Sequence, residues 1–122
     1  EVVPVPHLVQ VPLTKLWFRG VCNVRGNLFS VTEVQAFLGD EASNLSPNHR
    51  LLLINQQFLF NSSLLVSRIL GLKNTDNLPC VEVNDAARPW VRAEYRDADG
   101  SLWPELDVKR LVQMPEFLLL SL

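Results

Sequence analysis

The stretch Trp90-Val-Arg-Ala-Glu-Tyr-Arg96 alternates apolar and polar side chains, residue by residue. Because successive side chains of a strand point to opposite faces, this period predicts a β-strand with one face buried and the other in water. The buried set is Val91, Ala93 and Tyr95, and the outer set is Trp90, Arg92, Glu94 and Arg96. Asp97-Ala-Asp-Gly-Ser101 follows with a strong Asp-Gly turn signal. The stretch therefore predicts one strand of an antiparallel sheet that ends in a turn.

Further strands and short helices are expected to interleave along the rest of the chain. Strands are expected over 15–24, 50–60, 80–84 and 116–122, and helices over 31–38, over 63–70 and from Pro104 to the residue before Pro115. This order predicts an α+β fold, with a mainly antiparallel sheet and short helices packed on one face. The nearest common topology is the ferredoxin-like, split βαβ arrangement. The alternative is a β-sandwich in which short helices connect the sheets.

Two local signals refine these expectations. Ser30 and Glu33 have the spacing of a capping box, in which each side chain bonds the backbone N–H of the other, so they predict a helix start. Gly20 lies in the middle of the first long predicted strand. A glycine in a strand indicates a bulge or a close approach of another backbone segment.

The chain is expected to form one domain. Its 122 residues are 48 % hydrophobic and 20 % charged, a composition that excludes global disorder and allows a sizeable core. Residues 1–12 contain Pro4, Pro6 and Pro12, so they are expected to be an extended linker or an edge strand. Residues 13–122 are expected to be a single globular domain of a larger protein.

Charge argues against two classes of partner. The formal net charge of -2 does not favour phosphate backbones or anionic lipid, and no apolar run reaches the roughly 20 residues that span a bilayer. Trp17, Phe18, Arg19 and Arg25 allow an alternative interpretation as a surface for single-stranded nucleic acid. Core aromatic residues with flanking arginines explain the same pattern, and the negative net charge favours that explanation.

The cysteines and two sequence motifs bear on the compartment. Cys22 and Cys80 are either free thiols or a disulfide, and the even count allows both. Because both cysteines lie at or inside predicted strands, where their Cα atoms can come close enough to bridge, we predict the disulfide. Asn61-Ser-Ser63 and Asn44-Leu-Ser46 match the glycosylation pattern. Asn61 is expected to be exposed, because it lies between a predicted strand and a predicted helix. These features favour an extracellular or lumenal location over a cytosolic or nuclear one.

No catalytic or metal-binding pattern stands out. His7 lies at a proline-rich end and His49 in a polar loop. Neither place suggests the rigid, apolar surroundings that tune a catalytic base, and both histidines are expected to be surface residues. The five glycines are scattered and form no phosphate-binding loop. The acidic residues around the 97–101 turn lack the spacing of a calcium loop. We therefore expect no enzyme activity, no cofactor and no metal.

The sequence predicts a non-enzymatic protein-interaction module of a larger extracellular or lumenal protein, whose partner it does not identify. The alternative is an intracellular module of a protein or nucleic-acid assembly, with free thiols and an exposed Trp and Arg surface. In both cases the predicted contact surface is the outer set of the 90–96 strand, since Trp and Arg dominate interface energetics. That surface consists of Trp90, Arg92, Glu94 and Arg96.

Overall fold

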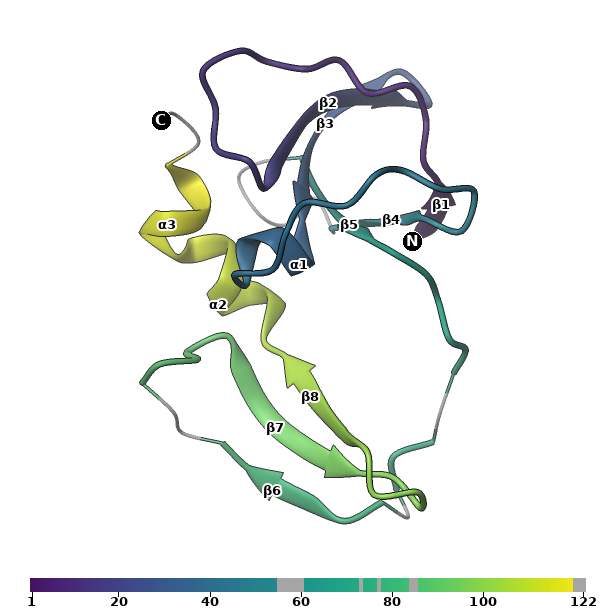
Figure 1. Ribbon diagram of the computed structural model, residues 1–122, viewed down its shortest axis with the longest axis vertical. Coiled ribbons are helices and arrows are strands. Elements are labelled where there is room, and N and C mark those ends of the chain that lie inside the picture. The colour runs from purple at the N-terminus through teal and green to yellow at the C-terminus, as the bar shows by residue number, and fades with distance from the viewer. Residues whose placement is uncertain (55–60, 73, 77, 84–85, 120–122) are drawn as a thin grey trace. The chain divides into compact units, whose positions relative to one another are not determined.

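A computed structural model describes residues 1–54, 61–72, 74–76, 78–83 and 86–119 (Figure 1). The chain divides into two compact units, of which the first is Glu1–Leu70 and the second is Gly71–Leu119. Each unit contains its own sheet. The expected division into a short leading segment and a single domain over 13–122 stays a prediction.

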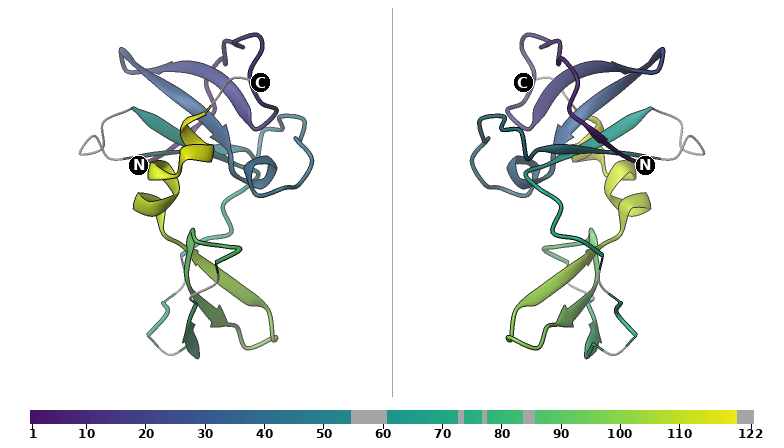
Figure 2. Two further views of the ribbon diagram at one scale, coloured as in Figure 1. Left: turned by 90° about the vertical axis from the view of Figure 1, so that its left-hand side faces the viewer. Right: turned by 90° about the vertical axis from the view of Figure 1, so that its right-hand side faces the viewer.

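The first unit is built on a five-stranded sheet with the order β1-β4-β5-β3-β2. Its elements are β1 (Val2–Pro4), β2 (Phe18–Val24), β3 (Asn27–Glu33), α1 (Val34–Phe37), β4 (Arg50–Leu53) and β5 (Ser62–Val66). The pair β3 and β5 is parallel, and the other neighbours are antiparallel. The short α1 packs against β3 and β5 (Figure 2). Buried apolar side chains of four strands form the core, namely Cys22, Phe29, Val31, Leu51 and Leu65.

Gly20 is a point of close backbone approach, as its place in the sequence predicted. The register of β2 against β3 shifts between Phe18 and Gly20, and the φ angle of Gly20 is +112°. A Cβ atom at Gly20 would lie 2.1 Å from the carbonyl oxygen of Val9. Val9 and Val21 exchange backbone hydrogen bonds of 2.8 and 2.9 Å here. The missing side chain therefore lets the leading segment pair with β2.

The expected helix over 31–38 is largely wrong, because β3 continues to Glu33 and α1 begins only at Val34. Ser30 does not cap a helix, and its hydroxyl lies 3.4 Å from that of Ser62 in β5. Parallel pairing with β5 keeps this segment extended. Its residues 31–33 are fully buried between two neighbouring strands. Tertiary pairing therefore overrides a local helix signal.

The expected helix over 63–70 is also wrong, because residues Ser62–Val66 form β5. This strand lies between β4 and β3, and its first four residues are all buried. The sequence of a strand with both edges paired and both faces covered is a continuous apolar run. By sequence pattern alone, such a run cannot be distinguished from a buried helix. The strand expected over 50–60 is found as β4, and residues 55–60 lie outside the described residues.

The second unit contains a three-stranded antiparallel sheet with the order β6-β7-β8 (Figures 1 and 2). Its elements are β6 (Cys80–Glu82), β7 (Val91–Arg96), β8 (Leu102–Leu106), α2 (Val108–Gln113) and α3 (Pro115–Leu118). The strand and the turn predicted over 90–101 are confirmed, and Asp97 N–H donates to Ser101 O at 2.8 Å across the turn.

Pro104 lies in β8 and does not begin a helix as expected. Strand β8 is at the edge of its sheet, and the backbone nitrogen of Pro104 points away from β7. The missing N–H of the proline therefore costs no hydrogen bond between the strands. The helix instead begins after Asp107, whose carboxylate accepts from the N–H of Arg110 at 3.1 Å. Pro115 begins α3, so the strand expected over 116–122 is wrong, and residues 120–122 lie outside the described residues.

These elements confirm the α+β class with mainly antiparallel sheets and short helices. The ferredoxin-like topology is not found in the described part of the chain. There the strands form one five-stranded sheet with a parallel central pair and one three-stranded meander.

Candidate functional site

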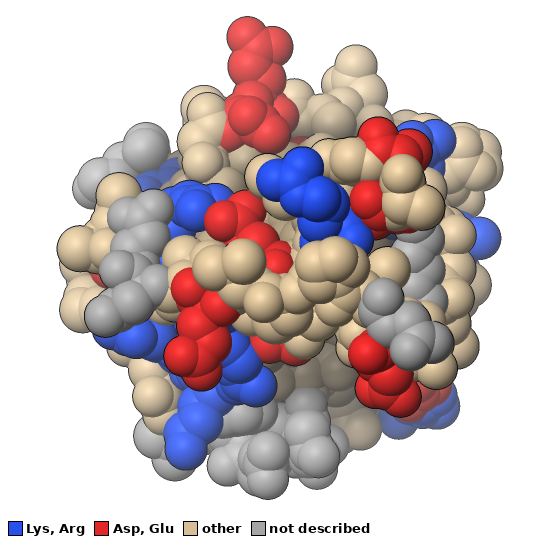
Figure 3. Space-filling model, turned by 90° about the horizontal axis from the view of Figure 1, so that it is seen from below, with Lys and Arg blue, Asp and Glu red and all other residues tan. Residues whose placement is uncertain are grey.

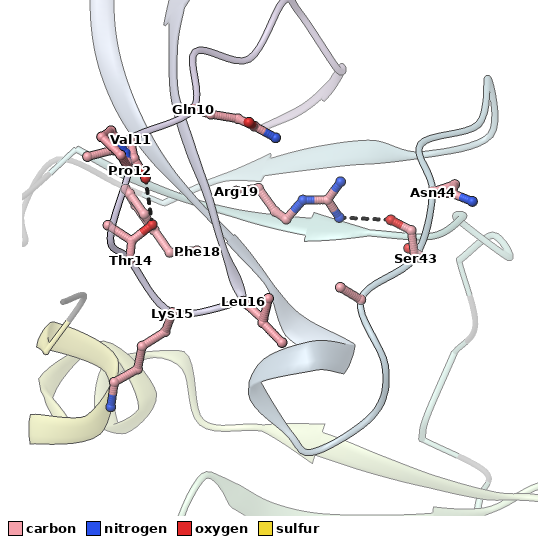
Figure 4. A pocket seen from close by; sticks show the side chains of 11 residues that line it. Gln10, Val11, Pro12, Thr14, Lys15, Leu16, Phe18, Arg19, Ser43 and Asn44 are labelled. Carbon is pink, nitrogen blue, oxygen red and sulfur yellow. Dashed lines mark hydrogen bonds between the residues drawn. The ribbon is translucent and has the colours of Figure 1, made fainter. Parts of the chain in front are cut away.

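A hollow of about 500 Å³ opens on the surface of the first unit. Two loops form it, one from the leading segment and one between α1 and β4 (Figure 4). The lining residues are Gln10, Val11, Pro12, Thr14, Lys15, Leu16, Phe18, Arg19, Ala42, Ser43 and Asn44. Both loops belong to the first unit, so the hollow is complete within that unit.

The loop of residues 11–16, which we call the apolar loop, carries unusually exposed large side chains. Leu13 is 78 % exposed and Leu16 is 82 % exposed. Leu13 has a φ angle of 60°, in the left-handed region that side chains other than glycine rarely adopt. The hydroxyl of Thr14 donates to Val11 O at 2.8 Å and holds the loop in this shape. The fold thus presents apolar surface to solvent on a constrained backbone.

The opposite loop is fixed by a buried carboxylate. The side chain of Glu33 is 3 % exposed, and its Oε1 accepts from Nη1 of Arg19. The other oxygen, Oε2, accepts from the N–H of Ser43 at 3.0 Å and from its hydroxyl at 2.9 Å. Arg19 also donates to Ser43 O at 3.0 Å (Figure 4). A buried charge is tolerated only when it is paired and hydrogen-bonded, and Glu33 meets both conditions.

His49 joins this network, and it is buried, contrary to the expected surface position. Its Nε2 lies 3.1 Å from the hydroxyl of Ser43, a geometry that resembles a nucleophile and its base. However, the N–H of Ser46 donates to Nδ1 of His49 at 3.0 Å. Nδ1 is therefore an acceptor, so the ring proton is on Nε2. That nitrogen donates to Ser43 and has no free pair to accept its proton, so the arrangement braces a loop and does not activate a serine.

The charged groups that line the hollow are both cations. Lys15 and Arg19 reach it, while none of the lining residues in the described chain is acidic. The side chain of Arg19 is 18 % exposed, and the hydrogen bonds it makes to Glu33 and Ser43 all use Nη1. Because Glu33 neutralises Arg19, the hollow combines an apolar rim with the positive charge of Lys15.

The residues predicted to form the contact surface all lie in the second unit, on or beside β7. Arg92 and Glu94 each take part in ion pairs, Arg92 with Glu105 at 3.7 Å and with Asp107 at 3.6 Å, and Glu94 with Arg88 at 3.3 Å. Arg96 is exposed, and Trp90 is half-buried. On the face shown in Figure 3, basic side chains lie among acidic ones and form no single basic patch.

The predicted disulfide is wrong, because both cysteines are free. Cys22 is buried in the core of the first unit, where burial raises the pKa of its thiol. Cys80 is exposed on β6. Asn44 is exposed on the wall of the hollow, whereas Asn61 is half-buried at the start of β5.

Two other kinds of site, a metal centre and a membrane-spanning helix, are not found among the described residues. Among them, no group of three or more His, Cys, Asp or Glu side chains is placed to hold a metal ion. None of the helices in the described residues has the length and apolar character needed to cross a membrane.

The chain belongs to the CheW-like domain family, whose pattern it matches over residues 1–116. It is 31 % identical over 101 residues to Protein PilI of Pseudomonas aeruginosa, a match that covers 78 % of this chain and 55 % of that protein. The chain thus spans about half the length of the curated relative it matches. The fold is similar to that of the scaffolding protein TtCheW from Thermoanaerobacter tengcongensis. That likeness has a TM-score of 0.73 at 20 % identity and covers 99 % of this chain and 84 % of the other.

This membership agrees with the expected non-enzymatic protein-interaction module. It contradicts the expected extracellular or lumenal location, because CheW-like relatives are cytoplasmic signalling proteins. The expected extracellular glycoprotein is therefore wrong, and Asn61 and Asn44 are not assigned as glycan carriers. The intracellular alternative, with free thiols, fits the findings better.

Sequence reasoning missed the network of Arg19, Glu33, Ser43 and His49. Glu33 has the spacing of a capping box, which predicts an exposed side chain at a helix start, and no motif connects it with the loop of residues 40–49. One available signal was the concentration of hydrogen-bonding residues in that loop, with a histidine directly before an apolar strand.

Proposed function

We propose that this chain is an intracellular, non-enzymatic module that holds protein partners in an assembly. Family membership supports this role, and one observation carries the choice of docking site. Leu13 and Leu16 are among the most exposed large apolar side chains of the described chain, and they lie on the apolar loop beside the hollow. Exposed apolar surface rimmed by polar groups is typical of protein interaction sites.

Exposure of the leucine side chains of the apolar loop to water is unfavourable. Full burial of a leucine side chain stabilises by about 1.5–3 kcal/mol, so both leucines gain free energy when a partner covers them. The loop is also already constrained, through Thr14 and the left-handed backbone at Leu13. A constrained loop loses less conformational entropy on binding than a mobile one.

We take the occupant to be an apolar segment of a protein partner that carries a carboxylate. Charge complementarity supports this choice through Lys15, since none of the described lining residues is acidic, whereas Arg19 is already paired with Glu33 behind the wall. The carboxylate would lie against Lys15, while the apolar part covers Leu16.

Affinity capture from the source cells tests the proposal. The parent chain and a Leu13→Ser, Leu16→Ser variant serve as baits, and mass spectrometry identifies the retained proteins. The matched control is Leu72→Ser, because Leu72 is fully exposed in the second unit. We expect a partner that the parent and the control retain and the double variant loses. Equal retention by all three baits would reject the apolar loop as the docking site.

The surface of Trp90, Arg92, Glu94 and Arg96 stays a second predicted contact site. A Trp90→Ala variant tests it through the thermal melt and through retention of the same partner. Loss of folding would make Trp90 a structural residue, and unchanged retention by a folded variant would reject the surface.

A further inference from the structure

The ring of His49 closes the turn that leads into β4. The backbone N–H of His49 donates to Ser46 O at 3.1 Å, and the backbone N–H of Ser46 donates to Nδ1 of the ring at 3.0 Å. The hydroxyl of Ser46 also lies 3.1 Å from Nδ1. His49 is buried, whereas Ser46 is exposed. The imidazole is therefore the buried anchor of an otherwise exposed turn.

The other ring nitrogen holds the wall of the hollow. Nε2 of His49 lies 3.1 Å from the hydroxyl of Ser43, and that hydroxyl lies 2.9 Å from Oε2 of Glu33. Ser43 and its neighbour Asn44 line the hollow (Figure 4). One imidazole thus joins the turn at Ser46 to the wall at Ser43.

This arrangement requires the neutral ring. The ring donates from Nε2 and accepts at Nδ1, and a protonated imidazole has two donors and no acceptor. The hydroxyl of Ser46 can rotate and accept from a protonated Nδ1, but the backbone N–H of Ser46 cannot become an acceptor. Two N–H groups would then point at each other. The turn therefore has to move away from the ring when the ring gains a proton.

The charged groups around the ring do not compensate for this loss. The carboxylate of Glu33, at the end of β3, is one hydroxyl away from Nε2, and Arg19 of β2 already pairs with it. Arg50, the first residue of β4, donates from Nη1 to the carbonyl oxygen of His49 at 2.7 Å. Two of the three charged side chains that the described hydrogen bonds link to His49 are therefore cations. The described network places no carboxylate at Nδ1 to hold the turn closed around a protonated ring.

We infer that His49 is an acid-sensitive switch of this wall. When the ring gains a proton, the turn of residues 46–49 opens and the loop that carries Ser43 loosens. Histidine side chains ordinarily change charge between about pH 5 and pH 8, so mild acid is the signal. The inference concerns the wall itself and does not rest on the proposed function.

Hydrogen exchange of the Ser46 N–H, followed by NMR in the unchanged chain, tests the inference. Exchange is expressed as protection relative to the intrinsic rate at each pH, because that rate itself depends on pH. From about pH 7.5 to about pH 5.5 the ratio of protonated to neutral imidazole can change about a hundredfold, while carboxyl groups ordinarily stay ionised. We expect the protection of Ser46 to fall at least about fivefold over this range, and that of Leu51 in β4 to stay level. Level protection of Ser46 would overturn the inference.

Two variants assign the effect, because His7 and His49 are the only histidines of the chain. His49→Asn places an amide oxygen near the position of Nδ1, where it can accept from Ser46 but does not titrate. His7→Asn is the matched control, since His7 is exposed. We expect His7→Asn to keep the parental pH dependence and His49→Asn to lose it. Parental pH dependence in His49→Asn would overturn the inference.

The ring nitrogens of the unchanged chain give a check that needs no variant. Their NMR chemical shifts identify which nitrogen carries the proton and follow the uptake of the second one. We expect the proton on Nε2 near neutral pH, and uptake of the second proton together with the loss of protection at Ser46. A neutral ring with its proton on Nδ1, or a protonated ring beside a still protected Ser46, would overturn the inference. None of these results bears on whether a partner docks at the apolar loop.

Discussion

The carboxylate of Glu33 holds Ser43 at two points, through its N–H at 3.0 Å and its hydroxyl at 2.9 Å. The contact joins the end of β3 to the loop that forms one wall of the hollow. Arg19 neutralises the same carboxylate from β2. A single buried side chain thus fixes both the charge and the position of that wall.

Removal of this carboxylate is expected to be costly. Glu33→Ala leaves the largely buried Arg19 without its counter-ion, and breaking such a pair costs about 3–5 kcal/mol of unfolding free energy. Ser43→Ala is expected to cost less, about 1–3 kcal/mol, because it removes hydroxyl bonds alone. Urea denaturation measures both, with the exposed Glu41→Ala as control. A Glu33→Ala loss no larger than that of Glu41→Ala would contradict the structural role.

Gly20 offers a second test of the first unit. Gly20→Ala brings a Cβ to within 2.1 Å of Val9 O, so the leading segment must move. We expect a loss of about 3 kcal/mol or more in unfolding free energy. The control is Gly100→Ala, which has a φ angle of +89° but open space around it, and which carries only the backbone strain of about 1–2 kcal/mol. Equal losses would show that the approach of Val9 is unimportant.

The two thiols are expected to differ sharply toward a thiol-specific reagent. Cys80 is exposed and reacts in the native protein, whereas Cys22 is buried and has a raised thiol pKa. Since the thiolate is the reactive form, Cys22 should react only after denaturant is added. Rapid native modification of Cys22, detected by peptide mass mapping, would show that the core of the first unit opens readily.

Tyr95 gives a spectroscopic test of the second unit, because it is the one tyrosine of the chain. Its hydrogen bond with the Cys80 side chain, together with the nearby charges of Cys80 and Glu105, raises its pKa above the ordinary value. Cys80→Ser removes the main cause, so the midpoint of tyrosinate absorbance should move to lower pH. A midpoint that stays in place would mean that β6 and β7 are not paired with Cys80 opposite Tyr95.

The sequence predicts the second sheet better than the first. Strand β7 alternates apolar and polar residues because one of its faces is exposed to solvent, and the turn after it contains the Asp-Gly pair typical of hairpins. Strands β3 and β5 lie inside the first sheet, with a neighbouring strand on each side. Their sequences therefore lack the alternation of apolar and polar residues that marks a strand with one solvent-exposed face, and they resemble buried helices. Both strands form because they pair with segments far apart in the sequence, and no local sequence pattern indicates that pairing.

The candidate site was harder to predict because its parts come together only in the fold. Arg19, Glu33 and Ser43 lie on different elements and form no motif. In the sequence, nothing distinguishes Leu13 and Leu16 from core leucines. Their exposure follows from the backbone conformation of the loop, which only the structure shows. The family assignment overturns the extracellular location that the cysteines and the glycosylation motifs had favoured.

The most direct test of the proposed function is the Kd between this chain and its purified partner, measured by calorimetry for the parent and for Leu16→Ser. Truncating a central apolar contact costs about 1.4 kcal/mol or more, so we expect Leu16→Ser to weaken binding at least about tenfold with an unchanged Tm. Leu72→Ser should bind like the parent. A Leu16→Ser variant that folds and binds with the parental Kd would contradict the assignment of the apolar loop as the docking site.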